Sequence, residues 1–422
     1  MTTYSSGSVF KKRWKRLSHG WQGVDWLLFV LPMGITIFSS VLISSTQKYT
    51  GESGYAINHA ILGMIGCGLA LWIARTRYEM LLQWRWIIYV ATIASLVAVM
   101  AIGTEGLGAQ RWINVFGFYV QPSEFAKLGA IITLAAMLKD RDAPTLYGMG
   151  KALAITSVPW ALVFLQPDLG TSLVFGAIVI GMLYWSGIHP GWLVLMVSPL
   201  VSAILFEISI PAWIFWVVAM GVVAFRSLPW WSWYSGIVAI VVNLASGKLG
   251  EVMWGVLKDY QKDRLILFLD PDKDPLGGGY HLIQSRIAIG AGELWGRGLF
   301  HGTQTQLSFI PEQHTDFIFS AVGEELGFVG GVALLLAFWL ICLRLVMIAQ
   351  NAKDNFGSLL AVGVLSMIVF QAVLNICMTI GLAPITGIPL PWMSYGRSAL
   401  LTNFIAIGIV ESVANYRFKL KF

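Results

Sequence analysis

The feature that most restricts the fold of this chain is a series of apolar runs, each about as long as a membrane-crossing helix. The run at 25–44, for example, spans the ~30 Å hydrocarbon layer of a bilayer as one helix. Twelve such spans are predicted along the 422 residues, at 25–44, 57–75, 84–103, 121–138, 150–166, 168–186, 191–208, 211–226, 229–246, 317–347, 356–380 and 395–415.

The composition supports a polytopic membrane protein. Hydrophobic residues make up 57% of the chain against 12% charged, and the mean hydropathy of +0.71 is too high for a soluble protein of this size. The excess of Lys and Arg lies scattered in short loops, so it predicts membrane topology and no nucleic-acid partner. The three cysteines fall inside apolar runs and predict neither a disulfide framework nor a metal cluster.

The distribution of basic residues predicts the orientation. Residues 1–24 form a basic N-terminus that precedes an uncleaved first span, and 416–422 form a basic C-terminus. With both termini in the cytoplasm, 17 of the 28 Lys and Arg residues fall in cytoplasmic segments, as the positive-inside rule requires. The long loop 247–316 is then extracytoplasmic. The polar clusters at 104–127, 166–172, 256–316 and 384–398 all fall on that outer side, which predicts one shared site.

Two of these clusters surround helix starts. Pro122 suits a first helical position, and Glu124 and Lys127 share a face of the helix that follows. A charged pair at the mouth of a span is costly, which favours a functional role. The alternative is a local ion pair that anchors the helix end at the membrane interface, with Trp112 as part of an aromatic belt. Arg111 is the candidate for an anionic ligand group. In QPDLGTS, 166–172, Asp168 either caps the next helix or pairs with Lys127 or Arg264, and both interpretations stay open.

The long polar segment 259–331 contains the strongest candidate. In EQHTDFIFSAVGEELG, 312–327, a helix would place Asp316, Ser320, Gly323, Glu324 and Gly327 on one face. A carboxylate at the membrane boundary is suited to act as a general base, whereas the alternative is that Asp316 caps the helix and Glu324 forms an ion pair within the bundle. Asp270, Asp272 and Asp274 resemble the start of a calcium loop, but Pro275 and the lack of a closing Glu favour a solvated turn.

The remaining signals are weaker or absent. GIPLPWMSYGRS, 387–398, is a proline-interrupted segment whose role, packing or cavity lining, the sequence leaves open. The motifs GxxxxGK[ST], HExxH, GxSxG and CxxC do not occur, so neither ATP-driven transport nor zinc hydrolysis has support.

With these residues in view, the chain resembles the SEDS family of bacterial cell-wall glycan polymerases, which includes RodA and FtsW. The matching motifs are GAQRWI at 108–113, QPSEFAK at 121–127, QPDLGTS at 166–172, YQKDR at 260–264, LDPDKDPLGGGYHLIQS at 269–285, GTQTQLSFIPEQHTDFIF at 302–319, GEELG at 323–327 and PLPWMSYG at 389–396. GYH with GTQ favours the RodA branch. The chain departs from the pattern by a longer stretch at 187–258 and by Glu293 and Arg397, where relatives carry glycine.

The resemblance implies an all-α membrane protein with one domain at 25–415 and ten core transmembrane helices. The longer stretch at 187–258 predicts an extra helical hairpin at 191–226 in addition to these. The resemblance also implies a multi-pass protein of the bacterial plasma membrane that joins the disaccharides of lipid II into glycan strands outside the membrane. Asp316 matches the family's catalytic carboxylate, and the predicted substrate-binding residues are Arg111, Trp112, Glu124, Lys127, Asp168, Arg264, Gln284 and Glu324.

Partners and cofactors follow from the same resemblance. The expected partners are lipid II, a class B penicillin-binding protein transpeptidase and membrane proteins of the elongation complex. No particular cofactor is implied, no nucleotide site is required, and a divalent cation is left open. For Arg397 we expect a loop conformation that does not need glycine, with the guanidinium at the outer surface or paired with an acidic residue of the 259–316 loop. The competing functions are a lipid II flippase, an FtsW-type division polymerase and a non-catalytic scaffold for a transpeptidase.

Overall fold

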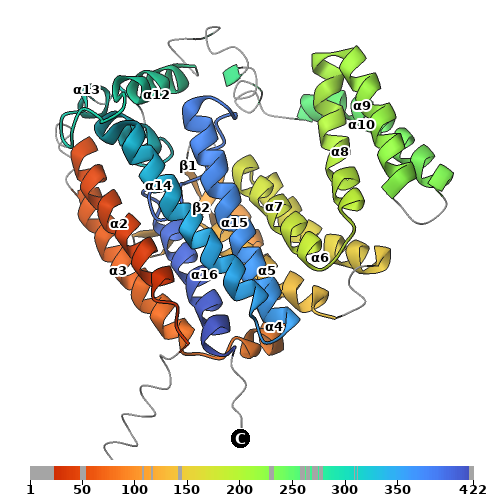
Figure 1. The fold of residues 1–422 in the computed structure, drawn as a ribbon, viewed down its shortest axis with the longest axis horizontal. Coiled ribbons are helices and arrows are strands. Elements are labelled where there is room, and N and C mark those ends of the chain that lie inside the picture. The colour runs from red at the N-terminus through yellow and green to blue at the C-terminus, as the bar shows by residue number, and fades with distance from the viewer. Residues whose placement is uncertain are drawn as a thin grey trace, which may run out of the picture.

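A computed structural model of the chain is almost entirely helical (Figure 1). It describes residues 23–47, 54–106, 109–115, 117–140, 145–227, 232–256, 262, 267–268, 274, 279–307, 309–310 and 312–417. Twelve helices of at least 17 residues lie in these ranges: α2 (Leu27–Thr46), α3 (Gly54–Ala74), α4 (Glu79–Ile102), α5 (Pro122–Leu138), α6 (Leu146–Leu165), α7 (Leu169–Trp185), α8 (Pro190–Ile208), α9 (Ile210–Ser227), α10 (Ser232–Val256), α14 (Ile318–Gln350), α15 (Asn355–Ile380) and α16 (Arg397–Asn415).

Each of these helices coincides with one of the twelve predicted spans. Nine of them, within the described residues, are long and apolar enough to cross a membrane. Their outward surfaces are apolar as well: Trp72 is 66% exposed, Phe215 75% and Phe328 66%. Large exposed apolar side chains at this density mark a surface that contacts lipid. The chain is therefore a multi-pass membrane protein.

The described chain begins and ends at the same end of the bundle. The backbone N–H of Asp25, just before α2, donates to Glu411 Oε2 near the end of α16, over 3.0 Å. Arg344 in the last turns of α14 lies 3.5 Å from the Asp25 carboxylate. Tyr416 donates through its hydroxyl to the carbonyl of Arg75, after α3, over 2.7 Å. The starts of α5, α7, α14 and α16 lie at the other end (Figure 1).

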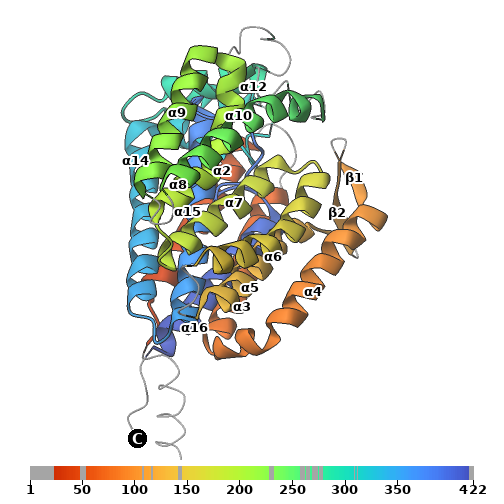
Figure 2. The same ribbon diagram turned by 90° about the vertical axis from the view of Figure 1, so that its right-hand side faces the viewer.

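Helices α8, α9 and α10 form a unit beside the main bundle (Figures 1 and 2). Polar side chains join them: Asn243 of α10 donates to Ser198 Oγ of α8 over 3.1 Å, and Ser202 Oγ donates to the Asn243 carbonyl over 2.7 Å. Trp213 of α9 donates to Ser202 Oγ over 2.9 Å. The predicted hairpin at 191–226 corresponds to α8 and α9, which pack mainly on α10.

A small antiparallel sheet, which the sequence analysis did not predict, precedes α5. Its strands β1 (Thr104–Gly106), β2 (Ala109–Val115) and β3 (Phe118–Val120) lie in the order β1-β2-β3. The sheet extends from the end of α4 (Figure 2). It delivers the chain to Gln121, the N-cap residue of α5, and Pro122 occupies the first helical turn as predicted.

Helix α14 is interrupted at Gly327, whose φ of 64° and ψ of −162° are not helical. Residues 293–298 fill the break. The backbone N–H of Arg297 and of Gly298 donate to the carbonyls of Glu324 and Glu325, each over 2.9 Å, while Phe328 donates to Glu293 over 2.9 Å. The short helices α12 (Tyr280–Ala291) and α13 (Thr303–Gln306) flank this segment. The start of α14 is thus fixed against the preceding loop.

This close approach depends on Gly292, where a Cβ would overlap the carbonyl oxygen of Gly323. We expect Gly292→Ala to lower the stability of the fold by about 1–3 kcal/mol, because the backbone of α14 must move to accept the methyl group. Gly290→Ala is the matched control, since nothing lies within 4 Å of the added atom. Thermal unfolding of the detergent-purified variants tests this, and equal melting temperatures for the two would contradict it.

Candidate functional site

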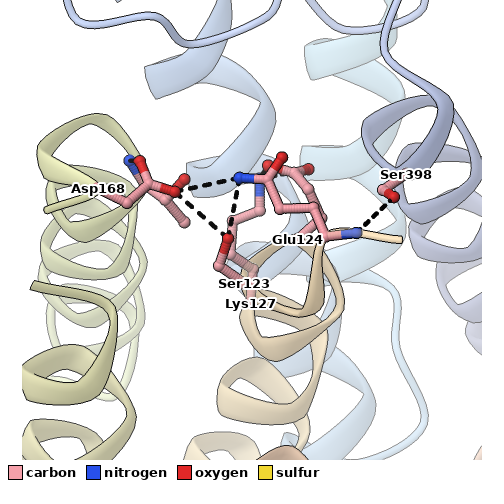
Figure 3. Close-up of polar contacts among 7 residues, drawn as sticks. Ser123, Glu124, Lys127, Asp168 and Ser398 are labelled. Carbon is pink, nitrogen blue, oxygen red and sulfur yellow. Dashed lines mark hydrogen bonds and ion pairs between the residues drawn. The ribbon is translucent and has the colours of Figure 1, made fainter. Parts of the chain in front are cut away.

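A buried ion pair lies at the start of α5 (Figure 3). Lys127 Nζ lies 2.9 and 2.8 Å from the two carboxylate oxygens of Glu124, and the side chains are 1% and 3% exposed. Glu124 stands in the first helical turn, where the helix dipole favours a negative charge. The predicted pairing is therefore present, and it is sheltered from solvent.

Asp168 joins the start of α7 to the start of α5 (Figure 3). Its Oδ1 accepts from the backbone N–H of Thr171 over 3.2 Å and caps α7. Its Oδ2 accepts from Gln121 Nε2 over 3.1 Å and from Ser123 Oγ over 3.3 Å. Of the two interpretations left open by the sequence, the N-cap is confirmed, and Lys127 pairs with Glu124.

Arg111 holds the turn that leads into α7. Its Nε donates to the carbonyl of Gln166 over 3.3 Å, and its guanidinium also donates to the carbonyl of Pro167. Gln166 in turn donates to the carbonyl of Leu96 in α4 over 2.9 Å. Trp112 follows in β2 and is half-buried. Arg111 and Trp112 thus lie beside the same α5–α7 end as Asp168.

Residues 381–396, between α15 and α16, form a segment of irregular backbone against these helix starts, buried at 388 and 390–394. Ser398 Oγ, just inside α16, accepts from the backbone N–H of Gln121 over 2.9 Å (Figure 3). Gly170 of α7 lies so close that a Cβ there would be 2.6 Å from the Thr386 carbonyl oxygen and 2.8 Å from Ile388. The segment therefore lines the α5–α7 end of the bundle.

Asp316 approaches the same segment from the other side. It lies half-buried in the turn 312–317. The N-cap residue of α14 is Phe317, which makes no side-chain cap. Several contacts attach the turn: Asn375 Nδ2 donates to the Asp316 carbonyl over 2.9 Å, and the backbone N–H of Tyr395 donates to the His314 carbonyl over 2.9 Å. Gln313 Nε2 also donates to the carbonyl of Thr46 at the end of α2 over 3.0 Å. The 381–396 segment thus contacts both the Asp316 turn and the start of α7.

Glu324 is fully buried beneath α13. Its carboxylate accepts from the backbone N–H groups of Gln304 and Thr305 over 2.7 and 2.9 Å, and from Thr303 Oγ1 over 3.2 Å. Both oxygens are thus occupied by protein donors, so in this structure Glu324 fixes α13 in place. Its predicted contact with substrate stays a prediction.

The sequence analysis missed the neighbouring carboxylate, Glu325, as a candidate. Glu325 is also fully buried, and it accepts from Ser45 of α2, from the backbone N–H of Phe300 over 3.2 Å and from Thr305 Oγ1 over 3.4 Å. The signal in the sequence was the pair of adjacent acidic residues, Glu324 and Glu325, within an apolar span. A carboxylate buried there requires several hydrogen-bond donors, so each of the two predicts a set of polar contacts.

Gln284 is the remaining predicted site residue among those that the structure describes. Gln284 lies half-buried in α12. Arg264, Asp270 and Asp272 lie outside the described residues. Among the residues that the structure describes, no three of His, Cys, Asp and Glu gather as a metal ion would need. We therefore assign no metal ligands.

The two positions where relatives carry glycine behave differently. Glu293 adopts a φ of 47°, in the left-handed region that glycine favours. Arg397 has no positive φ, as expected, but it is the first residue of α16 and not part of a loop. Its Nε donates to the Tyr395 hydroxyl over 3.3 Å, and the guanidinium lies 5.8 Å from the Phe118 ring centroid. These aromatic side chains are its described partners, in place of the acidic residue that was one of the two expected placements.

The chain matches the cell cycle protein family model FTSW_RODA_SPOVE over residues 23–213 and 191–419. Its relatives include the peptidoglycan glycosyltransferase MrdB of Escherichia coli K12, 34% identical over 394 residues, which span 92% of this chain and 94% of MrdB. The peptidoglycan glycosyltransferase RodA of Treponema pallidum is 36% identical over 423 residues, covering 92% and 97% of the two chains.

Solved structures share the fold. A chain from a peptidoglycan synthase complex superimposes with a TM-score of 0.72 at 28% identity, covering 94% of this chain and all of the other. The crystal structure of the rod shape determining protein RodA of Thermus thermophilus gives a TM-score of 0.63 at 24% identity, with 94% and 99% covered. The resemblance seen in the sequence motifs is confirmed, and the chain belongs to the FtsW, RodA and SpoVE family of cell cycle proteins.

Proposed function

We propose that this protein is a peptidoglycan glycosyltransferase that joins the disaccharides of lipid II into glycan strands at the outer face of the membrane. The observation that carries the proposal is the arrangement around residues 381–396. This segment contacts the turn that carries Asp316 and also the α5–α7 end, where the Glu124–Lys127 pair is buried. Relatives that match almost the whole chain are named for this activity.

The basic end of the bundle supports the outward orientation of the site. Arg77 and Lys353 each lie 3.3 Å from Glu79, and Arg344 lies 3.5 Å from Asp25. All belong to the end at which the described chain starts and finishes. Because positively charged loops remain in the cytoplasm, the opposite end, with Asp316, faces outward.

The chemistry assigns distinct roles to the two sides of the 381–396 segment. The 4-hydroxyl oxygen of the acceptor sugar attacks the anomeric carbon of the donor, Asp316 takes the hydroxyl proton, and the bond to the undecaprenyl pyrophosphate breaks. Arg111 and Lys127 lie beside the starts of α5 and α7, where an anionic leaving group is favoured by N-terminal dipoles and by cations. The activated donor supplies the driving force, so no nucleotide is needed.

The competing functions fit less well. A flippase needs polar groups along a path from one face to the other, whereas the buried Glu124–Lys127 pair, Asp168 and Glu324 all lie towards the outer end. A scaffold has no need of a carboxylate at 316. Relatives named MrdB and RodA are 34% and 36% identical, against 30–31% for those named FtsW, which favours a role in elongation. The related synthase complex, described as coordinating polymerization and crosslinking, supports a class B transpeptidase partner.

Asp316→Asn should abolish polymerisation of lipid II by the purified protein, because the amide cannot accept the hydroxyl proton. The fold should be unchanged, as judged by size-exclusion profile and melting temperature. Glu293→Gln, which neutralises an exposed carboxylate on the 293–298 segment, is the matched control and should retain the parent rate. Glycan synthesis by Asp316→Asn at more than a tenth of the parent rate would refute the assignment.

Lys127→Met should destabilise the protein by about 3–5 kcal/mol, because it leaves the Glu124 carboxylate buried without its partner. The double variant Glu124→Gln/Lys127→Met should recover most of that loss in thermal unfolding. It should still fail to polymerise lipid II, since the cation is missing. A double variant that polymerises at the parent rate would show that the pair serves only folding.

A further inference from the structure

Asn375 lies in α15 with none of its surface exposed. The two hydrogens of its amide nitrogen reach two different parts of the chain. One bond, of 2.9 Å, goes to the carbonyl oxygen of Asp316, and the other, of 2.7 Å, goes to the carbonyl oxygen of Ile388. A single primary amide therefore connects the turn before α14 to the segment 381–396.

Asp316 needs such support because it lies outside regular structure. It stands two residues before α14, and Phe317 caps that helix without a side-chain bond. The turn closes on itself through backbone bonds from Phe317 and Thr315 to the Glu312 carbonyl, over 3.3 and 3.1 Å. Thr315 Oγ1 also donates to the Glu312 carbonyl over 3.0 Å and to its carboxylate over 2.9 Å, so all of these bonds lie within the turn. Asn375, by contrast, extends from a long and buried helix, so it supplies a rigid reference for the backbone of Asp316.

The second acceptor, Ile388, connects this contact to the other half of the site. Ile388 is 2% exposed and packs where a Cβ on Gly170 would lie 2.8 Å from it. Gly170 is two residues from Asp168, which joins α7 to α5. Asn375 therefore helps to set the distance between the Asp316 turn and the start of α7, together with the backbone bond from Tyr395 to His314.

We propose that Asn375 is a positioning residue that fixes the main chain of Asp316 relative to the start of α7. The proposal rests on the role of Asp316 as general base given above. Asn375 takes no part in the chemistry itself. Its loss lets the Asp316 turn move, and a small displacement of a catalytic group is enough to slow a reaction strongly while substrate still binds.

Asparagine is suited to this position because its amide offers two donors at the end of a short side chain. Asp at 375 would present oxygens to two carbonyl oxygens, and Ala or Leu would leave both buried carbonyls without these donors. Ser would retain one donor, so it should support intermediate activity.

The test compares Asn375→Ala with Gln371→Ala in the full-length protein. Gln371 is the matched control: it lies one turn earlier on the same face of α15, is fully buried, and neither of its amide atoms has a partner among the described residues. Two quantities are measured, the steady-state kinetics of lipid II polymerisation and the hydrogen exchange of peptides that cover 312–317.

We expect Asn375→Ala to lower kcat by roughly 100-fold with the KM for lipid II changed less than twofold, and to speed hydrogen exchange in 312–317. Gln371→Ala should leave both near the parent values, and Asn375→Ser should fall between parent and Ala. Equal kcat values for the two Ala variants, or unchanged exchange in 312–317, would overturn the proposal. If Asn375→Ala does not fold, the same criteria apply to Asn375→Ser.

The exchange measurement separates this proposal from the proposed function. If Asp316 is not the base, Asp316→Asn stays active although Asn375→Ala still speeds exchange in 312–317. If Asn375 has no positioning role, exchange in 312–317 stays at the parent rate although Asp316→Asn is inactive.

Discussion

The site depends on hydrogen bonds from side chains to buried backbone carbonyls that lie outside helices and strands. Between α15 and α16 the backbone is irregular, and residues 388 and 390–394 are buried, so their polar backbone groups need partners within the protein. Side chains of three helices supply the contacts: Ser39 of α2 donates to the Met393 carbonyl, His59 Nε2 of α3 lies 3.3 Å from the Trp392 carbonyl oxygen, and Asn375 donates to the Ile388 carbonyl. Residues 381–396 are therefore held in one conformation from several sides.

The same requirement shapes the start of α14. The helix breaks at Gly327, and the carbonyls of Glu324 and Glu325 that it frees accept bonds from the 293–298 segment. The carboxylates of Glu324 and Glu325 also accept hydrogen bonds from residues 300–305, which include α13. The two fully buried carboxylates thus hold the surrounding loop in place, whereas Asp316 is only half-buried.

The helices and several of their first residues could be predicted from the sequence, because apolar runs and N-terminal helix residues are recognised from neighbouring residues alone. The twelve apolar segments appear as helices, Pro122 starts α5, and Asp168 caps α7. The strands before α5 could not be predicted from apolar periodicity, since β2 is short and contains Arg111. Arg111 itself looked like an anion ligand, but its described bonds go to the turn before α7.

The features that could not be predicted, such as the roles of Asn375 and Glu325, depend on long-range contacts. Asn375 lies in an apolar run with no local motif. Its two acceptors are the carbonyls of Asp316, 59 positions earlier, and Ile388, 13 positions later, and only the folded structure brings them to its amide. Glu325 likewise gains its role from Ser45, 280 residues away. Pairings between residues so far apart leave no trace in the spacing of a single sequence.

The most direct test of the account is the structure of this protein with lipid II bound. We predict the pyrophosphate at the starts of α5 and α7, beside Arg111 and Lys127. The 4-hydroxyl of an acceptor sugar should then lie within hydrogen-bond reach of the Asp316 carboxylate. Pyrophosphate held at the opposite end, near Arg77 and Arg344, or an acceptor sugar remote from Asp316, would contradict it.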